Sequence, residues 1–166
     1  MGEGRYWAIL VLLMLGWAGR SQAGEGVQFV LPDLEGRQVS LQEELARGPV
    51  VLDFWATWCK PCIQALPKLV QVAADYQDLG VQVYTVNIDG PRNLAKIRPF
   101  LQRHQVQLPV LLDRTKQVMK QFQLNAMPAT LVLTAKGGVV YRHQGYQPGD
   151  EAELRAALEA LALPKP

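Results

Sequence analysis

Residues 50–62 read Val-Val-Leu-Asp-Phe-Trp-Ala-Thr-Trp-Cys-Lys-Pro-Cys, and this stretch carries most of the information about the fold. Its first part, Val50–Trp55, is a nearly continuous apolar run, which predicts a central strand covered on both faces. It ends in Cys59 and Cys62, two thiols separated by two residues. A helix that begins near Cys59 would point its free N–H groups at that sulfur and favour the thiolate. A thiolate there is the nucleophile and the leaving group of disulfide exchange.

These two cysteines are the only ones among the 166 residues, so within the chain each can pair only with the other. A structural zinc ion needs four ligands, and the sequence has no second Cys-x-x-Cys. His104 and His143 lie far apart and share no ligand spacing, so we expect no metal site. A purely structural disulfide would close a very short loop and restrict the unfolded chain little. The pattern therefore indicates a redox-active dithiol.

The flanking residues extend this pattern to a family. Residues 51–62 resemble the active-site segment of thioredoxin-fold proteins, and the later Met127-Pro128-Ala129-Thr130 is similar to their cis-proline loop. Residues 29–41 are similar to the N-terminal hairpin of the TlpA/ResA branch, which comprises exported thiol-disulfide oxidoreductases. The resemblance covers about residues 27–163 and implies a thioredoxin-like fold.

Hydrophobic periodicity predicts an α/β order of elements. Alternation around residues 33–36 indicates a hairpin of Val27–Leu31 and Arg37–Leu41. Helices are expected at 42–47, 60–76, 93–104 and 114–122, with a last helix capped by Asp150, and strands at 50–55, 81–88, 108–112, 129–134 and 139–144. Pro67 is expected to kink its helix, and Pro99 to bend or split its own. The result is a thioredoxin-like three-layer α/β/α domain with an N-terminal hairpin and a central helix–strand insert, which again resembles the TlpA/ResA branch.

The two thiols are expected to have different roles. Cys59 lies at the helix start and nearer the surface, so we expect it to attack, while the more buried Cys62 would resolve the mixed disulfide. Lys60 adds positive charge near the thiolate, or is a solvated spacer, and Pro61 suits the first helical turn. Trp58 could flank the sulfurs and contact a client protein. Trp55 could also flank the sulfurs, or it could only pack in the core.

Asp53 is an acid inside the apolar strand. Burial penalises its ionised form, so its pKa should rise. Resemblance to cytosolic thioredoxins, which have an aspartate at this position, implies that Asp53 accepts the proton of the buried thiol. The alternative is an aspartate held by local hydrogen bonds. Thr85 stands where thioredoxins have a lysine beside that acid, so the pKa of Asp53 need not equal that of the thioredoxin aspartate.

Two further positions follow from the resemblance. The bond before Pro128 is expected to be cis, which would present a backbone edge to a client peptide. Met127 would offer that peptide a soft apolar contact; the alternative is that Met127 only packs against the rest of the protein. ResA-type proteins have a glutamate at a strand end where this chain reads Asn87-Ile88-Asp89-Gly90. For Asp89 we favour capping of the turn over substitution for that glutamate.

The chain begins with the pattern of a secretory signal. Arg5 supplies a positive charge, Tyr6–Leu15 an apolar run, and Ser21-Gln22-Ala23 a cleavage site before Gly24. The run is shorter than the roughly 20 residues of a membrane-spanning helix, so cleavage is favoured over a retained membrane anchor. We therefore divide the chain into a signal peptide, 1–23, and a thioredoxin-like domain, 24–166, with a periplasmic or other extracytoplasmic location.

The composition limits the partners. The net charge is +2, and it falls to (17 − 2) − (15 − 1) = +1 once Arg5, Arg20 and Glu3 are removed with the leader. Such a balance gives no case for nucleic-acid binding. We expect no resident cofactor. The expected partners are disulfide-containing client proteins and a membrane thiol-disulfide electron donor.

The leading hypothesis is an exported disulfide reductase that uses Cys59 and Cys62. By resemblance to the branch, its clients would be apo-cytochromes c or copper-site proteins. A Cu(I) metallochaperone is the alternative, because Cys59, Cys62 and Met127 could supply soft sulfur ligands. A peroxiredoxin is disfavoured, since Ala56 stands where that family has threonine or serine three residues before its reactive cysteine.

Overall fold

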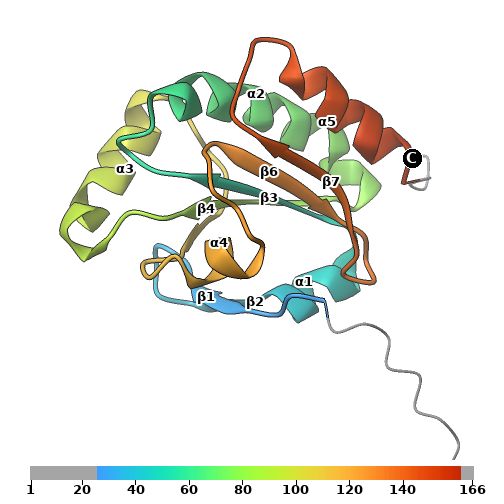
Figure 1. Cartoon of the computed structure of the whole chain (residues 1–166), viewed down its shortest axis with the longest axis horizontal. Helices are drawn as coiled ribbons and strands as arrows, with labels where there is room; N and C mark the ends of the chain where they lie inside the picture. The colour runs from blue at the N-terminus through green and yellow to red at the C-terminus, as the bar shows by residue number, and fades with distance from the viewer. Residues whose placement is uncertain (1–25, 162–166) are drawn as a thin grey trace, which may run out of the picture.

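The computed structural model describes residues 26–161, so the predicted signal peptide and both ends of the predicted domain lie outside the described residues. A five-stranded sheet runs through the middle of the molecule in the order β5-β4-β3-β6-β7 (Figure 1). Three of the strands are parallel: β3 (Val50–Trp55), β4 (Gln82–Asn87) and β5 (Val110–Leu112). The other two add in antiparallel fashion: β6 (Ala129–Leu133) on β3, and β7 (Val139–Gln144) on β6.

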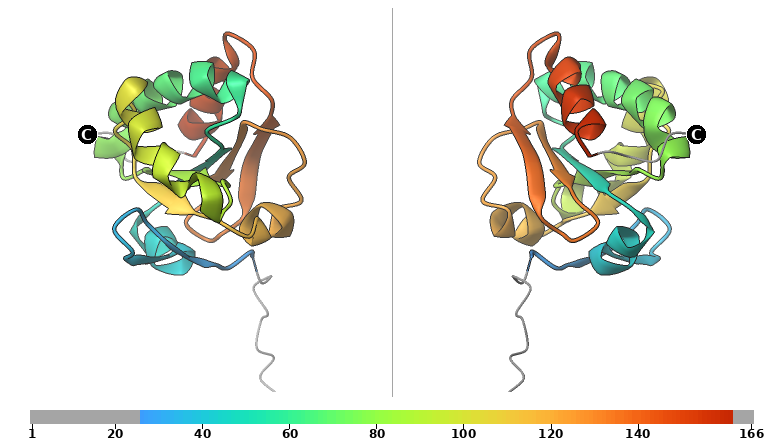
Figure 2. Two further views of the ribbon diagram at one scale, coloured as in Figure 1. Left: turned by 90° about the vertical axis from the view of Figure 1, so that its left-hand side faces the viewer. Right: turned by 90° about the vertical axis from the view of Figure 1, so that its right-hand side faces the viewer.

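Helices cover both faces of this sheet. On one face lie α2 (Lys60–Tyr76), α3 (Leu94–Arg103) and α5 (Asp150–Glu159). On the other lie α1 (Leu41–Arg47), α4 (Gln117–Gln121) and the hairpin of β1 (Val30–Pro32) and β2 (Gln38–Ser40) (Figures 1 and 2). Two short 3-10 helices, η1 (Gln77–Leu79) and η2 (Pro91–Asn93), follow α2 and precede α3. The predicted three-layer α/β/α fold with an N-terminal hairpin is confirmed.

Strand β3 is the centre of the core, and all six of its residues are buried. Because successive side chains of a strand point to opposite faces, β3 binds both helical layers. Phe54 meets Phe122, which follows α4, with ring centroids 6.2 Å apart. Trp55 stacks on Phe100 of α3 with centroids 4.9 Å apart. The strand that leads to Cys59 is thus held rigidly from both sides.

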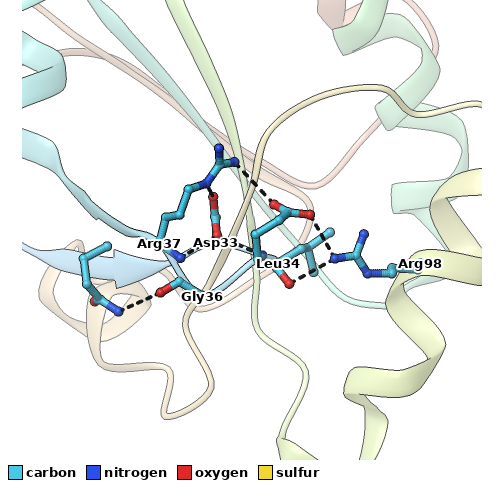
Figure 3. Close-up of polar contacts among 7 residues, drawn as sticks. Asp33, Leu34, Gly36, Arg37 and Arg98 are labelled. Carbon is cyan, nitrogen blue, oxygen red and sulfur yellow. Dashed lines mark hydrogen bonds and ion pairs between the residues drawn. The ribbon is translucent and has the colours of Figure 1, made fainter.

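The N-terminal hairpin is fixed at its turn. The Asp33 carboxylate accepts the backbone N–H groups of Glu35 and Arg37 and pairs with the Arg37 guanidinium at 2.6 Å. From α3, Arg98 donates to the Leu34 carbonyl at 3.0 Å and pairs with Glu35 at 2.9 Å (Figure 3). These contacts tie the hairpin to the helix–strand insert, so the branch-specific additions to the fold brace each other.

Two local predictions were wrong. The predicted helix 114–122 is shorter, because Lys116 adopts a left-handed φ of 59° and its N–H closes a turn onto the Asp113 carbonyl. Helices α2 and α3 continue through Pro67 and Pro99, so Pro99 does not split its helix. Asp150 does not cap α5, because its carboxylate accepts the N–H of Gln147, which precedes the helix.

Along residues 26–161, no helix combines the length and the apolar character needed to cross a membrane.

Candidate active site

Cys59 and Cys62 lie where β3 gives way to α2, and they form a disulfide with their Cα atoms 5.4 Å apart. Cys59 is the N-cap residue of α2, and its sulfur accepts the backbone N–H of Cys62 at 3.3 Å. Pro61 occupies the first turn, where its missing N–H costs no helical hydrogen bond. Once the bond is reduced, the same N–H and the positive end of the helix dipole stabilise a Cys59 thiolate.

The two sulfurs differ in access. Cys59 is 5% exposed and lines a groove of about 360 Å³ that is open to solvent, whereas Cys62 is fully buried. The groove is also lined by four other residues singled out from the sequence: Trp58, Lys60, Pro61 and Met127. The structure thus gathers these side chains around one thiol and leaves the other inside.

The remaining lining residues of this groove were not anticipated. They come from α4 and from the loop before the cis Met127–Pro128 bond: Met119, Asn125 and Ala126. Pro128 lies outside the groove lining and instead lines a cavity beneath α2. The cis bond itself was expected.

The two tryptophans have opposite environments. Trp58 is 57% exposed, with the Lys116 ammonium 5.9 Å from its ring centroid, a cation–π distance. Trp55 is fully buried against Phe100, as a core residue is. Only Trp58 is therefore available to a client protein.

Asp53 is 2% exposed, and its carboxyl has one hydrogen bond to the described residues. Its Oδ1 accepts the Thr130 hydroxyl at 2.7 Å, while its Oδ2 is buried with no protein partner. Burial raises the pKa of Asp53 to about 7, against the smaller lowering effect of the Thr130 hydrogen bond. Its neighbour on β4, Thr85, donates to the Pro109 carbonyl and contributes no charge. The acid is thus poised near neutrality by desolvation.

A cavity of about 40 Å³ adjoins Asp53, enough space for water. From α2 it is lined by Ala65 and Leu69, and Cys62 lies one turn before Ala65, on the same side of the helix. Asp53 therefore shares this cavity with residues of α2 that begin one turn after the buried thiol.

Polar residues form a row across the sheet that leads away from Asp53. Asp53 pairs with Thr130 on β6, and Thr130 pairs with His143 on β7. Both partners line the cavity, as does Asp150, whose carboxylate lies 2.9 Å from the His143 ring. This row runs from the buried acid in the central strand to the edge strand β7.

Asp89 does not cap its own turn, contrary to our expectation. Its buried carboxylate accepts the Thr57 N–H at 2.8 Å, the Thr57 hydroxyl at 3.1 Å and the Asn87 amide at 2.9 Å. Thr57 lies two residues before Cys59, so Asp89 anchors the loop that leads to Cys59. Asp89 and Thr57 are 32 residues apart in the sequence, so no local pattern predicts this contact.

Comparison with known proteins agrees with this geometry. The model of the AhpC/TSA family matches residues 24–142. Thiol-disulfide oxidoreductase ResA of Halalkalibacterium halodurans is 32% identical over 126 residues, which cover 75% of this chain and 70% of that protein.

Solved structures with the same fold are also similar. A Chlorobium tepidum protein assigned as a thiol:disulfide interchange protein DsbE superposes with a TM-score of 0.74 at 31% identity, covering 82% of this chain and 94% of that one. The structure of MTB dsbF in mixed oxidized and reduced forms gives a TM-score of 0.69 at 27% identity, over 81% and 95% of the two chains. The fold is therefore thioredoxin-like.

Asp53→Asn should stabilise the protein at neutral pH and slow its turnover. The folded pKa of about 7 lies above the unfolded value near 4, so ionised Asp53 costs stability as the pH rises from about 4 to 7. We expect the free energy of unfolding to increase by about 1–3 kcal/mol at pH 8, since the burial penalty disappears but a buried amide N–H₂ remains to be satisfied. Loss of the proton acceptor should lower the turnover rate at pH 7 at least about tenfold.

Urea unfolding at pH 4, 6 and 8 measures the first effect, with the exposed Asp78→Asn as the matched control. The pH-dependent part of the gain should vanish at pH 4. A stability difference that stays constant over this range, together with normal turnover, would reduce Asp53 to a structural residue.

Proposed function

This chain belongs to the AhpC/TSA family, and from that premise we propose that it is an exported reductase of protein disulfides. It is a thiol-disulfide oxidoreductase by its relationship to ResA. The observation that carries the proposed role is the difference in access between the two sulfurs: Cys59 lines an open groove at a helix N-terminus, and Cys62 is fully buried. Asp53, whose pKa burial raises to about 7, lines a cavity under the same helix.

The reaction starts from the reduced dithiol. The Cys59 thiolate attacks one sulfur of a client disulfide, the client S–S bond breaks, and the second client sulfur leaves as a thiolate that takes a proton from water. The Cys62 thiol then gives its proton to ionised Asp53 and attacks the Cys59 sulfur. The client's first sulfur leaves and is protonated in turn, so the client gains two electrons and two protons. The protein is left with the Cys59–Cys62 disulfide.

The groove beside Cys59 suits an extended client segment. Met127 supplies a soft apolar contact, and Trp58 offers an exposed aromatic face. Lys60 is exposed at the start of α2, where its charge favours the thiolate. Pro61 and Pro128 shape the backbone on either side of the sulfurs.

The location and the electron supply are further parts of this proposal. Residues 1–23 have the pattern of a signal peptide, and export would place the dithiol where disulfides persist. A reductase there needs a continual supply of electrons, which a membrane thiol-disulfide donor would provide by exchange with Cys59–Cys62. Proteins that bind c-type haem or copper through cysteines are the proposed clients.

Cu(I) binding is the second candidate, and one observation favours it. Cys59, Met119 and Met127 line the same groove and would offer soft sulfur ligands. Over residues 26–161, no group of three His, Cys, Asp or Glu side chains could hold a metal ion. A metallochaperone would bind one Cu(I) tightly in the reduced state and show no turnover with disulfides, which separates it from the reductase.

Cys62→Ser should trap client proteins as mixed disulfides through Cys59, because the resolving thiol is gone. Cys59→Ser should trap almost none, since Cys62 is buried. Non-reducing electrophoresis of the two variants after incubation with an oxidised protein substrate measures the difference. Equal trapping by both variants would overturn the assignment of roles.

The reduction potential should lie nearer thioredoxin's value of about −270 mV than the roughly −120 mV of a strong periplasmic oxidant. The helix terminus and Lys60 stabilise the thiolate and favour an oxidant, but Pro61 and Asp53 are shared with reductants and outweigh them in our assignment. Equilibration with glutathione buffers at pH 7 gives the potential. A dithiol half reduced at potentials above about −180 mV would make the protein an oxidase or isomerase.

A further inference from the structure

Trp58 stands between two grooves. One is the groove beside Cys59 described above. The second, of about 400 Å³, lies between Trp58 and α3 and is floored by Pro99 and Phe100. A client bonded to Cys59 would have its chain beside Trp58, so both grooves are within reach of the residues next to the client cysteine. The second groove has no part in the thiol chemistry.

Positive charge is concentrated on these grooves. Lys60 lines the first, Lys96 and Arg103 line the second, and Lys116 lies over the Trp58 ring. No carboxylate lines either groove. Two acids bound to neighbouring segments are buried: Asp89 accepts the Thr57 N–H, and the Asp113 carbonyl accepts the Lys116 N–H. A client in either groove would therefore contact cationic side chains and no carboxylate of the lining.

These cations are also uncommitted. Along residues 26–161, none of Lys60, Lys96, Arg103 and Lys116 lies within 4.0 Å of a carboxylate oxygen. Four arginines elsewhere in the described residues have acidic partners: Arg37, Arg47, Arg98 and Arg155. A charge that no internal partner neutralises is free to pair with a ligand.

The positive charge is local, because the chain as a whole carries only +2. Acidic side chains gather on the first turn of α5, at Asp150, Glu151 and Glu153. Helices α3 and α5 lie at opposite ends of the layer that contains α2 (Figure 1). The cations that line the two grooves are thus distinct from this acidic cluster.

We propose that the groove between Trp58 and α3 binds an acidic segment of the client next to its disulfide. The inference rests on the proposed reductase function and gives that function a substrate class: disulfides flanked by aspartate or glutamate. Trp58 would contact the apolar part of the segment, and Lys96 and Arg103 would pair with its carboxylates. Complementary charge mainly accelerates encounter and rejects clients with basic flanks.

Three synthetic peptides of equal length test this directly. Each holds the same intramolecular disulfide, with flanks that are acidic, neutral or basic, and stopped-flow measurement gives the second-order rate constant of reduction by the full reduced protein. At about 50 mM ionic strength, the acidic peptide should react at least about tenfold faster than the basic one, and the ratio should shrink at about 0.5 M salt, where charges are screened. Equal rates for all three peptides would overturn the inference and leave the reductase intact. No reduction of any peptide would overturn the reductase itself.

Charge-reversed variants locate the effect. Lys96→Glu should lower the acidic-to-basic rate ratio several-fold, and the Lys96→Glu/Arg103→Glu double variant should invert the preference. Lys136→Glu is the matched control: Lys136 is exposed in the turn between β6 and β7, at the end of the sheet away from Cys59. An equal loss of preference in Lys136→Glu would assign the effect to net charge and overturn the groove as its site. Thermal melts of each variant establish that the fold is kept.

Discussion

Burial of the Asp53 carboxyl in the central strand is the constraint on which the site depends. All six residues of β3 are buried, yet the third-last of them is an acid with a single protein hydrogen bond. Desolvation raises its pKa to about 7. A carboxyl that titrates near neutrality can take a proton from a thiol and return it to water, which an ordinary aspartate with a pKa near 4 does poorly. The adjoining cavity of about 40 Å³ has room for water beside this carboxyl.

The rest of the site places one sulfur in the protein interior and the other at the surface. Helix α2 begins at the dithiol, so its first N–H groups stabilise charge on Cys59, while Cys62 lies on its buried face. Asp89 holds Thr57 and with it the loop before Cys59. Trp58, Lys60 and Lys96 face solvent. In our proposal, proton transfer and client selection depend on different residues and can be altered independently.

The strongest elements of the fold were predictable because their signals are local. The apolar run 50–55 and the helix 60–76 have the predicted bounds, and the cysteine spacing alone indicated redox chemistry. The features that the sequence did not predict depend on strand register and on contacts between residues far apart in the chain. Thr130 meets Asp53 across 77 residues, because β6 pairs with β3 in one particular alignment. The role of Asp89 and the left-handed turn at Lys116 likewise follow from tertiary contacts that no periodicity encodes.

The central claim is that Asp53 is held near neutrality by burial, and direct titration of its carboxyl tests it. Carbon-13 NMR of the aspartate side-chain carboxyls in the oxidised protein, with Asp53→Asn used to assign the resonance, follows ionisation between pH 3 and 9. The account predicts a midpoint near 7 for this one resonance. A midpoint near 4, the ordinary value for aspartate, would show that Asp53 is ionised throughout the working range and would contradict its role as proton acceptor.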